Sequence, residues 1–338
     1  MMPHDAQTIS IQDAESMVVK ALEASKVSHA AALSVAHAIV AAEAEGQIGH
    51  GFSRLSDYAA QAKSGKVNGH AEPTCRTSGP AALHIDAQNG FAYPALDLAV
   101  MQGIETATAQ GVAYMTVTRS HHCGALSVQV DRIAQAGLIG MMVANSPPAI
   151  APWGASTPLF GTNPIAFAAP RPGGTPLVVD LSLSVVARGK VMHAHKSGSQ
   201  IPLGWALDAK GHPTTDPEKA LAGSMVPIGD AKGTALALIV EILSAVVTGA
   251  NPSADVSSFF TVDGPPPGSG QFLIAIKPHD AAAFGDRIER VLASIKALDG
   301  ARIPGTRRIA ALNRAQEFGI TVPGQYLEIA RSLAMRGT

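Results

Sequence analysis

The sequence contains few cysteines, few aromatic residues and no excess of charge of either sign. Its only two cysteines, Cys75 and Cys123, form no Cys-x-x-Cys pair, which argues against a disulfide framework. The 25 basic and 26 acidic residues give a formal net charge of -1, so no basic surface for a nucleic acid or an anionic membrane is expected. Aromatic residues make up 4%, which argues against base stacking. We therefore expect neither a nucleic-acid nor a membrane partner.

Long uninterrupted hydrophobic runs are also absent. The longest, residues 233–250, contains Glu241 and so predicts a buried helix rather than a membrane span. Residues 1–7 include His4 and Asp5 and lead into no apolar segment, so we expect no signal peptide. Because two cysteines also fit a reducing compartment, we expect a cytoplasmic protein.

The composition is that of a folded protein with a large core. Hydrophobic residues account for 46% of the 338 residues and charged residues for 15%, and the length suggests about two domains. Capping residues, apolar spacing and glycine stops predict helices at residues 10–24, 28–46, 52–65, 127–137, 233–248, 280–298 and 325–335. Alternation and β-branched residues predict strands at residues 112–120, 138–146, 164–170, 175–184 and 272–278, and residues 84–111 indicate a strand, a turn and a helix.

Several common catalytic and nucleotide-binding motifs are missing. No Gly-x-Gly-x-x-Gly follows a strand and opens a helix, and no P-loop motif occurs, so a standard Rossmann site has no support. The Gly-x-Ser-x-Gly elbow of serine hydrolases is absent as well. The adjacent His121 and His122 would point in different directions, and no other ligand spacing is present, so we expect no metal.

A short polar loop between the second and third predicted helices carries the clearest candidate chemistry. It places His50 four residues before Arg54. An imidazole exchanges a proton near neutral pH, and a guanidinium can bind a carboxylate through two parallel hydrogen bonds. The pair therefore suits a small anionic substrate that needs one proton. The alternative is a surface histidine beside an arginine at a helix N-terminus.

Four further segments could contact a ligand. Residues 119–125 lie between a strand and a helix, where backbone N–H groups can hold an anion. Thr162 lies in a turn, Lys232 opposes the macrodipole at a helix N-terminus, and residues 302–308 contain three arginines that could bind a phosphate. Each segment has a structural alternative: an ordinary turn, a solvated lysine or a solvated basic turn.

Taken in order, these segments resemble one known family. The resemblance runs from about residue 41 to residue 308. It is carried by six motifs: GHGFSRL, SHHCGAL, LFGTNPIAFAAPR, VVDLSLSVVARGK, IPLGWALDAKGHPTTDP and RIPGTRR. Together they resemble the malate/L-lactate dehydrogenase family, whose members include Δ1-piperideine-2-carboxylate/Δ1-pyrroline-2-carboxylate reductases. HHCGAL and FGTNPIAFAAPR look closer to these reductases than to the malate enzymes.

The resemblance implies an α/β (α+β) fold without a Rossmann unit. A cofactor-binding domain with a mostly antiparallel sheet is expected over residues 76–250. Residues 1–75 and about 251–338 would form a discontinuous, helical substrate-side domain. The family also implies a homodimer whose active site lies near the subunit contact.

The resemblance assigns roles residue by residue. His50 would be the proton donor, Arg54 would bind the substrate carboxylate and Thr162 would touch the substrate. The residues expected to line the cofactor are His122, Cys123, Gly124, Ala125, Leu126, Asp180, Leu181 and Ser182. Those expected near its phosphates are Lys232, Pro304, Gly305, Thr306, Arg307 and Arg308. Because the arginines at 302, 307 and 308 could accept a 2′-phosphate, we expect NADPH, with NADH as the alternative.

The implied reaction is NAD(P)H-dependent reduction of a cyclic imino acid, from Δ1-pyrroline-2-carboxylate to L-proline or from Δ1-piperideine-2-carboxylate to L-pipecolate. One alternative is a malate- or lactate-type 2-hydroxy acid dehydrogenase that uses NAD. Another is a nucleotide-binding homologue without turnover. The imino acid reductases typically carry a serine before the histidine and an aspartate after the glycine of the Ala-Arg-Gly segment. Here these positions are Gly49 and Lys190, which leaves the proton route open.

Overall fold

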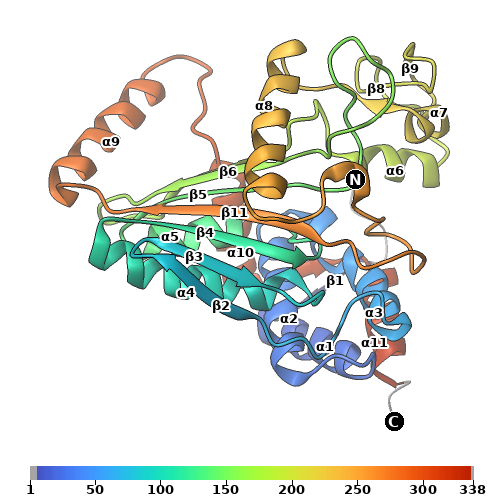
Figure 1. Ribbon diagram of the computed structural model, residues 1–338, viewed down its shortest axis with the longest axis horizontal. Coiled ribbons are helices and arrows are strands. Elements are labelled where there is room, and N and C mark those ends of the chain that lie inside the picture. The colour runs from blue at the N-terminus through green and yellow to red at the C-terminus, as the bar shows by residue number, and fades with distance from the viewer. Residues whose placement is uncertain (1–5, 336–338) are drawn as a thin grey trace.

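The computed structural model describes residues 6–335, which form a long sheet, a helical layer and a cap (Figure 1). The sheet has seven strands in the order β2-β3-β4-β11-β5-β6-β7, and every pair except β3–β4 is antiparallel. The strands are β2 (Thr74–Gly79), β3 (Ala82–Asp86), β4 (Val112–Ser120), β5 (Ile139–Ala144), β6 (Ile165–Ala169), β7 (Leu177–Leu181) and β11 (Ser269–Ile276). This mainly antiparallel sheet in a mixed α/β chain confirms the predicted fold class.

Two helices, α4 (Ala92–Gln110) and α5 (Ser127–Gln135), cover one face of the sheet. Alternation along the strands sends every second side chain toward them. Leu273 of β11 pairs with Met115 of β4 and Met142 of β5, and all three are buried in the core beneath these helices. The intervening Tyr114 and Phe272 point to the opposite face, where their rings stack 6.0 Å apart.

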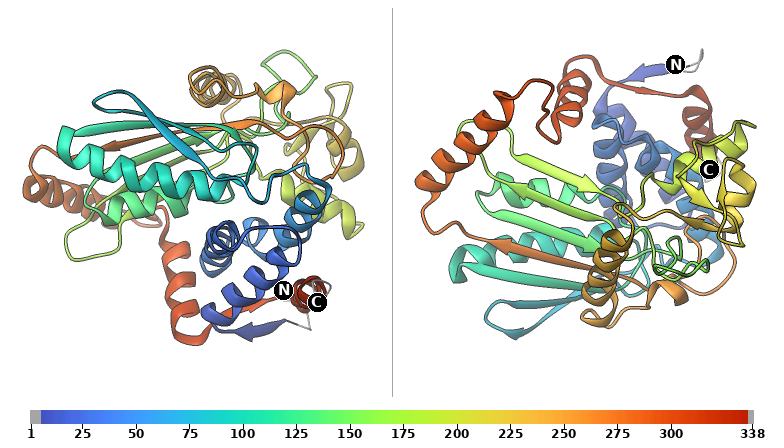
Figure 2. Two further views of the ribbon diagram at one scale, coloured as in Figure 1. Left: turned by 60° about the horizontal axis from the view of Figure 1, so that its bottom comes forward. Right: turned by 90° about the horizontal axis from the view of Figure 1, so that it is seen from above.

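The helical layer brings the two ends of the chain together (Figure 2). It contains β1 (Gln7–Ile9), α1 (Ile11–Glu23), α2 (His29–Ala44), α3 (Leu55–Ser64), α10 (Thr306–Phe318), β12 (Ile320–Val322) and α11 (Gly324–Met335). Strand β1 pairs with β12, and α1 packs against α11. The side chains of Ser10 and Ser28 accept backbone N–H groups at the starts of α1 and α2, as their capping positions predict.

The cap lies over one end of the sheet and has its own core. It contains α6 (Arg188–Lys196), β8 (Ala206–Leu207), β9 (Pro213–Thr214), α7 (Pro217–Ala222), β10 (Ser224–Met225) and α8 (Ala231–Glu241), which continues as the π-helical turn η3 (Ile242–Val246). Ile150, Leu183, Val191 and Ala237 lie in this core. The remaining elements are η1 (Ile48–His50), η2 (Phe52–Arg54), η4 (Ser253–Asp255) and α9 (Ala281–Lys296). Across residues 6–335, no helix has the length and hydrophobicity needed to cross a membrane.

The structure corrects the predicted elements in three places. Strand β11 lies inside the segment 251–338 that was predicted to join the helical domain, yet it is the central strand of the sheet. Helix α6, which contains residues 193 and 195, was not among the predicted elements. Residues 304–308, predicted as a turn, contain the start of α10, because Gly305 adopts φ 81° and turns the chain into that helix.

Candidate active site

A cavity of about 720 Å³ lies where the helical layer, the sheet and the cap meet. Its walls come from residues 47–54, residues 122–126, the strand ends near Thr162 and Asp180, the start of α6, and residues 256–260. Predicted site residues that line it are His50, Arg54, His122, Gly124, Leu126, Thr162, Asp180, Leu181 and Ser182. The fold thus brings residues far apart in the sequence to one cavity of a size typical of small-molecule sites.

The loop that carries His50 and Arg54 is held against α2 by Glu43. One carboxylate oxygen of Glu43 accepts the Phe52 N–H at 2.8 Å. A Cβ at Gly51 would come within 1.9 Å of Glu43 Oε2, so a larger residue there would displace the Glu43 carboxylate. Burial raises the pKa of the Glu43 carboxyl to about 7.

His50 faces the cavity as a neutral imidazole. Burial, and after it the charge of Arg54, lowers its pKa to about 4. Its Nδ1 is buried without a hydrogen-bond partner among the described residues. The ring of His122 stacks on it, with centroids 5.4 Å apart and planes inclined by 22°.

Arg54 is fixed in place, with part of its guanidinium left available. Its Nε donates to the Gly49 carbonyl at 2.8 Å, and Nη1 lies 3.5 Å from Asp57 Oδ2. The guanidinium carbon sits 4.5 Å above the centre of the Phe260 ring, in cation–π geometry. Nη2 has no partner within residues 6–335 and remains for a ligand.

Two tyrosine hydroxyls form a hydrogen-bonded chain that ends at His122. Its Nδ1 lies 2.5 Å from the Tyr58 hydroxyl, which lies 2.9 Å from the Tyr93 hydroxyl. Gly124 leaves room for this arrangement, because a Cβ there would come within 2.5 Å of the Tyr93 oxygen. Burial is the main cause that lowers the pKa of His122 well below its usual value, so this imidazole is neutral too.

The N-terminus of α5 is bound by Asp180, whose carboxylate accepts the Ser127 N–H at 2.8 Å. Burial raises the pKa of Asp180 to about 6. Cys123 and Ala125, which were predicted to line the cofactor, are instead buried behind the cavity wall. Their side chains pack inward because the backbone of residues 122–126 alternates between cavity and core.

The predicted phosphate-binding residues do not line the cavity. Lys232 is exposed at the start of α8, and residues 304–308 lie at the start of α10. Arg308 is buried, its Nη1 donates to Glu45 at 2.6 Å, and its Nη2 lies 3.4 Å from Asp131. Its charge is therefore already compensated within the chain.

The two positions that depart from the imino acid reductases provide no relay to His50. A Cβ at Gly49 would meet no atom within 4 Å, so the space that a serine would occupy is open. Lys190 is exposed in the first turn of α6. The unpartnered Nδ1 of His50 is consistent with this missing relay.

Sequence reasoning missed several residues of the cavity, above all Arg188. This guanidinium donates to the Pro148 carbonyl at 2.7 Å and to the Leu221 carbonyl at 3.3 Å. Burial lowers its pKa. Phe260 was missed as well. Arg188 lies in the VVDLSLSVVARGK motif, and that motif was the available signal.

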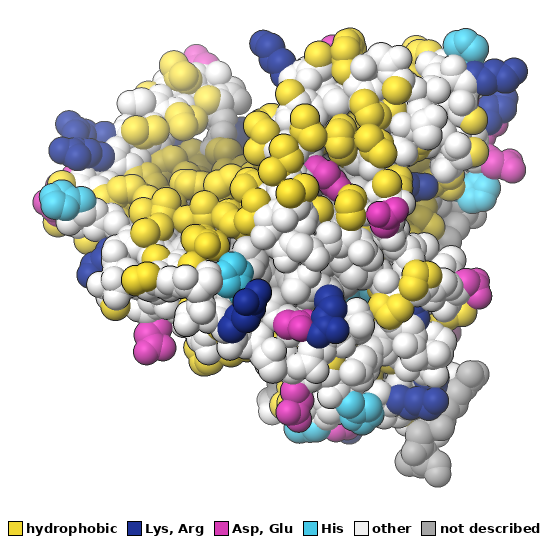
Figure 3. Space-filling model, viewed as in Figure 1, with side chains coloured by type: hydrophobic (Ala, Val, Ile, Leu, Met, Phe, Trp, Pro, Cys, Tyr) yellow, Lys and Arg dark blue, Asp and Glu magenta, His cyan; other side chains and the backbone are white. Residues whose placement is uncertain are grey.

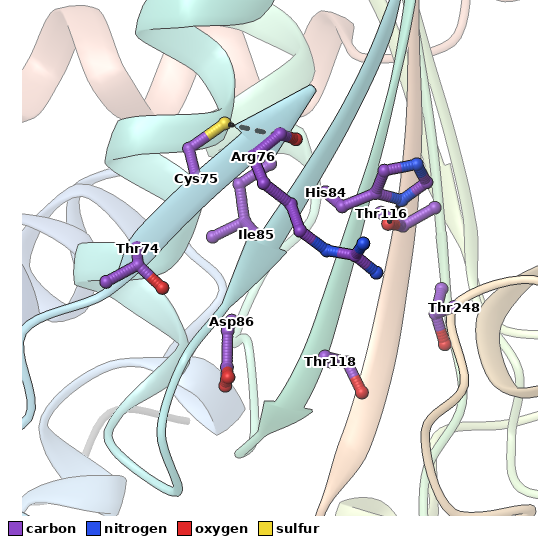
Figure 4. A pocket seen from close by; sticks show the side chains of 9 residues that line it. All are labelled: Thr74, Cys75, Arg76, His84, Ile85, Asp86, Thr116, Thr118 and Thr248. Atoms are coloured by element: carbon purple, nitrogen blue, oxygen red, sulfur yellow. Dashed lines mark hydrogen bonds between the residues drawn. The ribbon is translucent and has the colours of Figure 1, made fainter. Parts of the chain in front are cut away.

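A second hollow of about 220 Å³ lies on β2, β3 and β4 and shares no lining residue with the large cavity (Figure 4). Its polar side chains already have partners within the protein. His84 lies 2.8 Å from the Thr116 hydroxyl, and Asp86 forms an ion pair with Arg119. No group of three or more metal-binding side chains occurs within the described part of the chain.

The family model described as malate/L-lactate dehydrogenase matches residues 9–329. The chain belongs to the malate/L-lactate dehydrogenase family. This confirms the resemblance found in the motifs. Membership makes the chain an oxidoreductase.

The relatives divide between two substrate types. A (2R)-3-sulfolactate dehydrogenase (NADP(+)) of Chromohalobacter salexigens is 45% identical over 98% of this chain and 99% of its own length. A Δ1-pyrroline-2-carboxylate/Δ1-piperideine-2-carboxylate reductase of Pseudomonas aeruginosa is 38% identical over 93% and 96%. The solved Δ1-piperideine-2-carboxylate reductase of Pseudomonas syringae matches with a TM-score of 0.91 and 36% identity over 97% and 99%.

Proposed function

We propose that the large cavity binds a nicotinamide cofactor beside a small carboxylate and reversibly reduces the carbon next to that carboxylate. The observation that carries this proposal is the placement of His50 and Arg54 on one loop at the cavity wall. One group exchanges a proton and the other binds a carboxylate, which are the two tasks that such a reaction requires.

The residues of the cavity fit the cofactor. Apolar side chains such as Leu126, Met192 and Phe259 line it together with polar side chains such as His50 and Ser146, a mixture typical of cofactor sites. When bound, the reduced nicotinamide would supply the hydride. We propose NADP as the preferred cofactor, because the 45%-identical relative is named for NADP(+).

Arg54 would hold the substrate carboxylate through Nη2, while its bonds to Gly49 and Asp57 keep the side chain from turning. A bound carboxylate also offsets the positive charge that lowers the pKa of His50. Substrate binding would thus raise the pKa of His50 and favour proton uptake before reduction. In the oxidative direction, the neutral imidazole is ready to accept the proton of a hydroxyl group.

Two substrate classes fit this chemistry. The reductases at 36–38% identity support a cyclic imino acid, converted to L-proline or L-pipecolate. The 45%-identical relative supports a 2-oxo acid and its 2-hydroxy acid. The glycine at position 49 and the lysine at position 190 also depart from the imino acid reductases. We therefore place the 2-oxo acid first and the cyclic imino acid second.

The test measures oxidation of NADPH and NADH with pyruvate, oxaloacetate, 3-sulfopyruvate and the two cyclic imino acids. We expect a higher kcat/KM with a 2-oxo acid than with either imine, and a preference for NADPH. The reverse ranking of substrates would establish the second candidate. Nucleotide binding without turnover on any substrate would identify a non-catalytic homologue.

Two variants test the assigned roles within the same assay. His50→Ala removes the proton donor, and we expect kcat to fall by about 10²- to 10⁴-fold. Arg54→Lys keeps the charge but loses the Nη2 donor and the bonds to Gly49 and Asp57 that position it, so KM for the carboxylate substrate should rise. A near wild-type kcat in the first variant, or an unchanged KM in the second, would remove that residue from the mechanism.

We also propose that two copies of the chain associate through the outer face of the sheet. Hydrophobic side chains gather over this face between α9 and α8 (Figure 3). Phe167 and Ile276 are 37% and 41% exposed there, and Ile239 of α8 is 53% exposed. An apolar face of this extent is typical of a protein interface, and the family resemblance supports a second copy as its occupant.

A further inference from the structure

Residues 256–263, which follow η4, form a strap along one wall of the cavity. Four of them line the cavity: Val256, Ser258, Phe259 and Phe260. Residues 257–263 belong to no helix or strand, and within the described part of the chain they make no backbone–backbone hydrogen bond. A segment whose main-chain groups have no main-chain partners keeps its shape only if side chains hold it.

Lys66 is the side chain that holds the strap. Its Nζ donates to the carbonyl oxygens of Ser258 at 2.8 Å, Thr261 at 3.0 Å and Asp263 at 2.8 Å. An ammonium group has three N–H donors, so all three are used within the chain. Lys66 is 4% exposed and does not line the cavity, so it has no donor left for a ligand. Its ammonium instead fixes the main chain of the strap at three points.

Gln61 ties the strap to the same helix. This residue of α3 donates through Nε2 to the Phe259 carbonyl at 2.8 Å, and its Oε1 lies 2.6 Å from Nε2 of His121. Lys66 lies two residues beyond the end of α3, and Arg54 directly precedes its start. One helix therefore carries the carboxylate-binding group at its beginning and both anchors of the strap toward its end.

The strap presents two aromatic rings to the groups of the site. The ring centre of Phe260 lies 4.5 Å from the guanidinium carbon of Arg54, and the ring centre of Phe259 lies 5.2 Å from that of His122. A ring over Arg54 keeps water from one face of the guanidinium, which strengthens its attraction for a carboxylate. The position of both rings depends on the main chain that Lys66 holds.

We propose that Lys66 is a positioning residue of the reaction, acting through the main chain of the strap. Its ammonium keeps Phe259 and Phe260 in place beside the groups that meet the substrate and the cofactor. This inference rests on the proposed function, which assigns the substrate carboxylate to Arg54. Substrate binding should depend on Lys66 more than cofactor binding does, because the tyrosine hydroxyls hold His122 independently of the strap.

The kinetic test compares Lys66→Met with wild type. Methionine keeps an unbranched side chain and removes all three donors. We expect KM for the substrate that wild type reduces fastest to rise about 10-fold, the effect of about one lost hydrogen bond. The Kd for NADPH, measured by fluorescence titration, should change less than about 2-fold. An equal rise in both constants would overturn the proposal, because it would indicate a general loosening of the site.

Lys26→Met is the matched control. Lys26 is exposed, and its Nζ donates to the carbonyl of Lys63 at 3.3 Å, also near the end of α3. Removing this ammonium should leave both constants at their wild-type values. A rise in KM as large as that of Lys66→Met would assign the effect to the end of α3 rather than to the strap, and would overturn the proposal.

Limited digestion with chymotrypsin tests the strap without turnover, because this protease cuts after aromatic residues. Local opening exposes the chain to cleavage, so Lys66→Met should be cut after Phe259 or Phe260 faster than wild type, with the rest of the chain intact. Lys66→Arg is the second variant, used if Lys66→Met does not fold. Its planar guanidinium cannot direct three donors from one atom, so we expect the same pattern with a rise in KM of about 3-fold. Wild-type KM and wild-type cleavage in Lys66→Arg would then overturn the proposal.

A double variant tests whether Lys66 acts through the aromatic rings. Phe260→Ala removes the ring that lies over Arg54. In that background, Lys66→Met should raise KM by less than about 2-fold, because the two changes disrupt one arrangement. Effects that multiply in full would show that Lys66 acts by another route.

The two proposals fail in different ways. Unchanged KM and an uncut strap in Lys66→Met would overturn this inference and leave the proposed function standing. Faster cleavage of the strap, in a chain that reduces no substrate of the panel, would keep Lys66 as the anchor of the strap and end the proposed function.

Discussion

The Tyr58 hydroxyl lies 2.5 Å from Nδ1 of His122. Tyr93 is fully buried, and Tyr58 is its one hydrogen-bond partner in the part of the chain that the structure describes. The Tyr93 hydrogen must therefore point to Tyr58, and the Tyr58 hydrogen to Nδ1 of His122, because the reverse order would leave a buried hydroxyl without an acceptor. This direction places the proton of His122 on Nε2, where it can be donated into the cavity.

Replacing Tyr58 with phenylalanine should remove the hydrogen bond that fixes the tautomer of His122. Burial raises the pKa of both tyrosines, so both hydroxyls stay protonated at neutral pH. We expect Tyr58→Phe to lower kcat about 3- to 10-fold, the effect of one lost hydrogen bond, with KM for the cofactor unchanged. Nitrogen NMR of the His122 ring should show a mixture of tautomers.

Tyr93→Phe is the matched control for this prediction. It removes a hydroxyl from the same chain but leaves the Tyr58 hydroxyl able to donate to His122, so kcat should change less than about 2-fold. Wild-type kcat and an unchanged tautomer in Tyr58→Phe would show that the tyrosines do not orient His122.

Glu43 should make the stability of the protein depend on pH. Its pKa is about 7 in the folded protein, against an ordinary value of 4.5, so the folded state binds the proton more tightly than the unfolded state does. The resulting stabilisation is complete below about pH 4.5 and is lost as the pH rises through 7. Relative to Glu43→Gln, wild type should lose up to about 3 kcal/mol of unfolding free energy between about pH 5 and pH 8.

Urea unfolding of wild type and Glu43→Gln across this pH range checks the sign of the predicted change in unfolding free energy. Glu43→Gln keeps an oxygen for the Phe52 N–H, so the loop with His50 should hold its shape and kcat should stay near wild type. Glu43→Ala leaves that N–H unpaired, and we expect lower activity at every pH. A constant stability difference between wild type and Glu43→Gln would contradict the raised pKa.

Local sequence signals predicted most of the fold. The serine caps at positions 10 and 28 and the alternation in residues 112–120 identified elements that the structure contains. Helix α6 was missed because its sequence, RGKVMHAHK, has no cap signal and little amphipathicity. It is held by packing, since Val191 is fully buried in the core of the cap.

The site was predictable only where its residues are neighbours in sequence. His50 and Arg54 share one loop, so their spacing carried the hypothesis. The Arg188 guanidinium is positioned by backbone carbonyls that lie 40 and 33 residues away in the sequence. Arg308 is paired with a glutamate 263 residues away in the sequence. Such contacts depend on tertiary structure, and nothing in the local pattern indicates them.

The pairing of Arg308 with Glu45 predicts a role in stability. Both side chains are buried, and the Glu45 carboxylate also accepts the Ser127 hydroxyl at 3.0 Å. Arg308→Met should lower the unfolding free energy by about 3–5 kcal/mol, because it leaves Glu45 buried without a counter-charge. The double variant Glu45→Gln/Arg308→Met should recover much of this loss in denaturant unfolding.

The same variants test the predicted contact with the cofactor phosphates. Arg307 is exposed in the first turn of α10, so Arg307→Met is the control for a phosphate contact without a stability effect. If residues 304–308 bind the cofactor, Arg307→Met should raise KM for NADPH more than KM for NADH. A rise with Arg308→Met that persists in the stabilised double variant would assign the phosphate to Arg308 instead.

The proposed dimer predicts that a charge on the outer face of the sheet separates the subunits. Phe167 lies on β6 within this apolar face, and Phe167→Glu would bury a carboxylate between two copies. We expect wild type to sediment as a dimer at micromolar concentration and this variant as a monomer. The variant should also be less active if the active site lies near the subunit contact, as the family resemblance implies. Phe318→Glu is the matched control, because Phe318 is 66% exposed at the end of α10 in the helical layer. A wild-type monomer, or a dimer that survives Phe167→Glu and is lost in Phe318→Glu, would place the interface elsewhere.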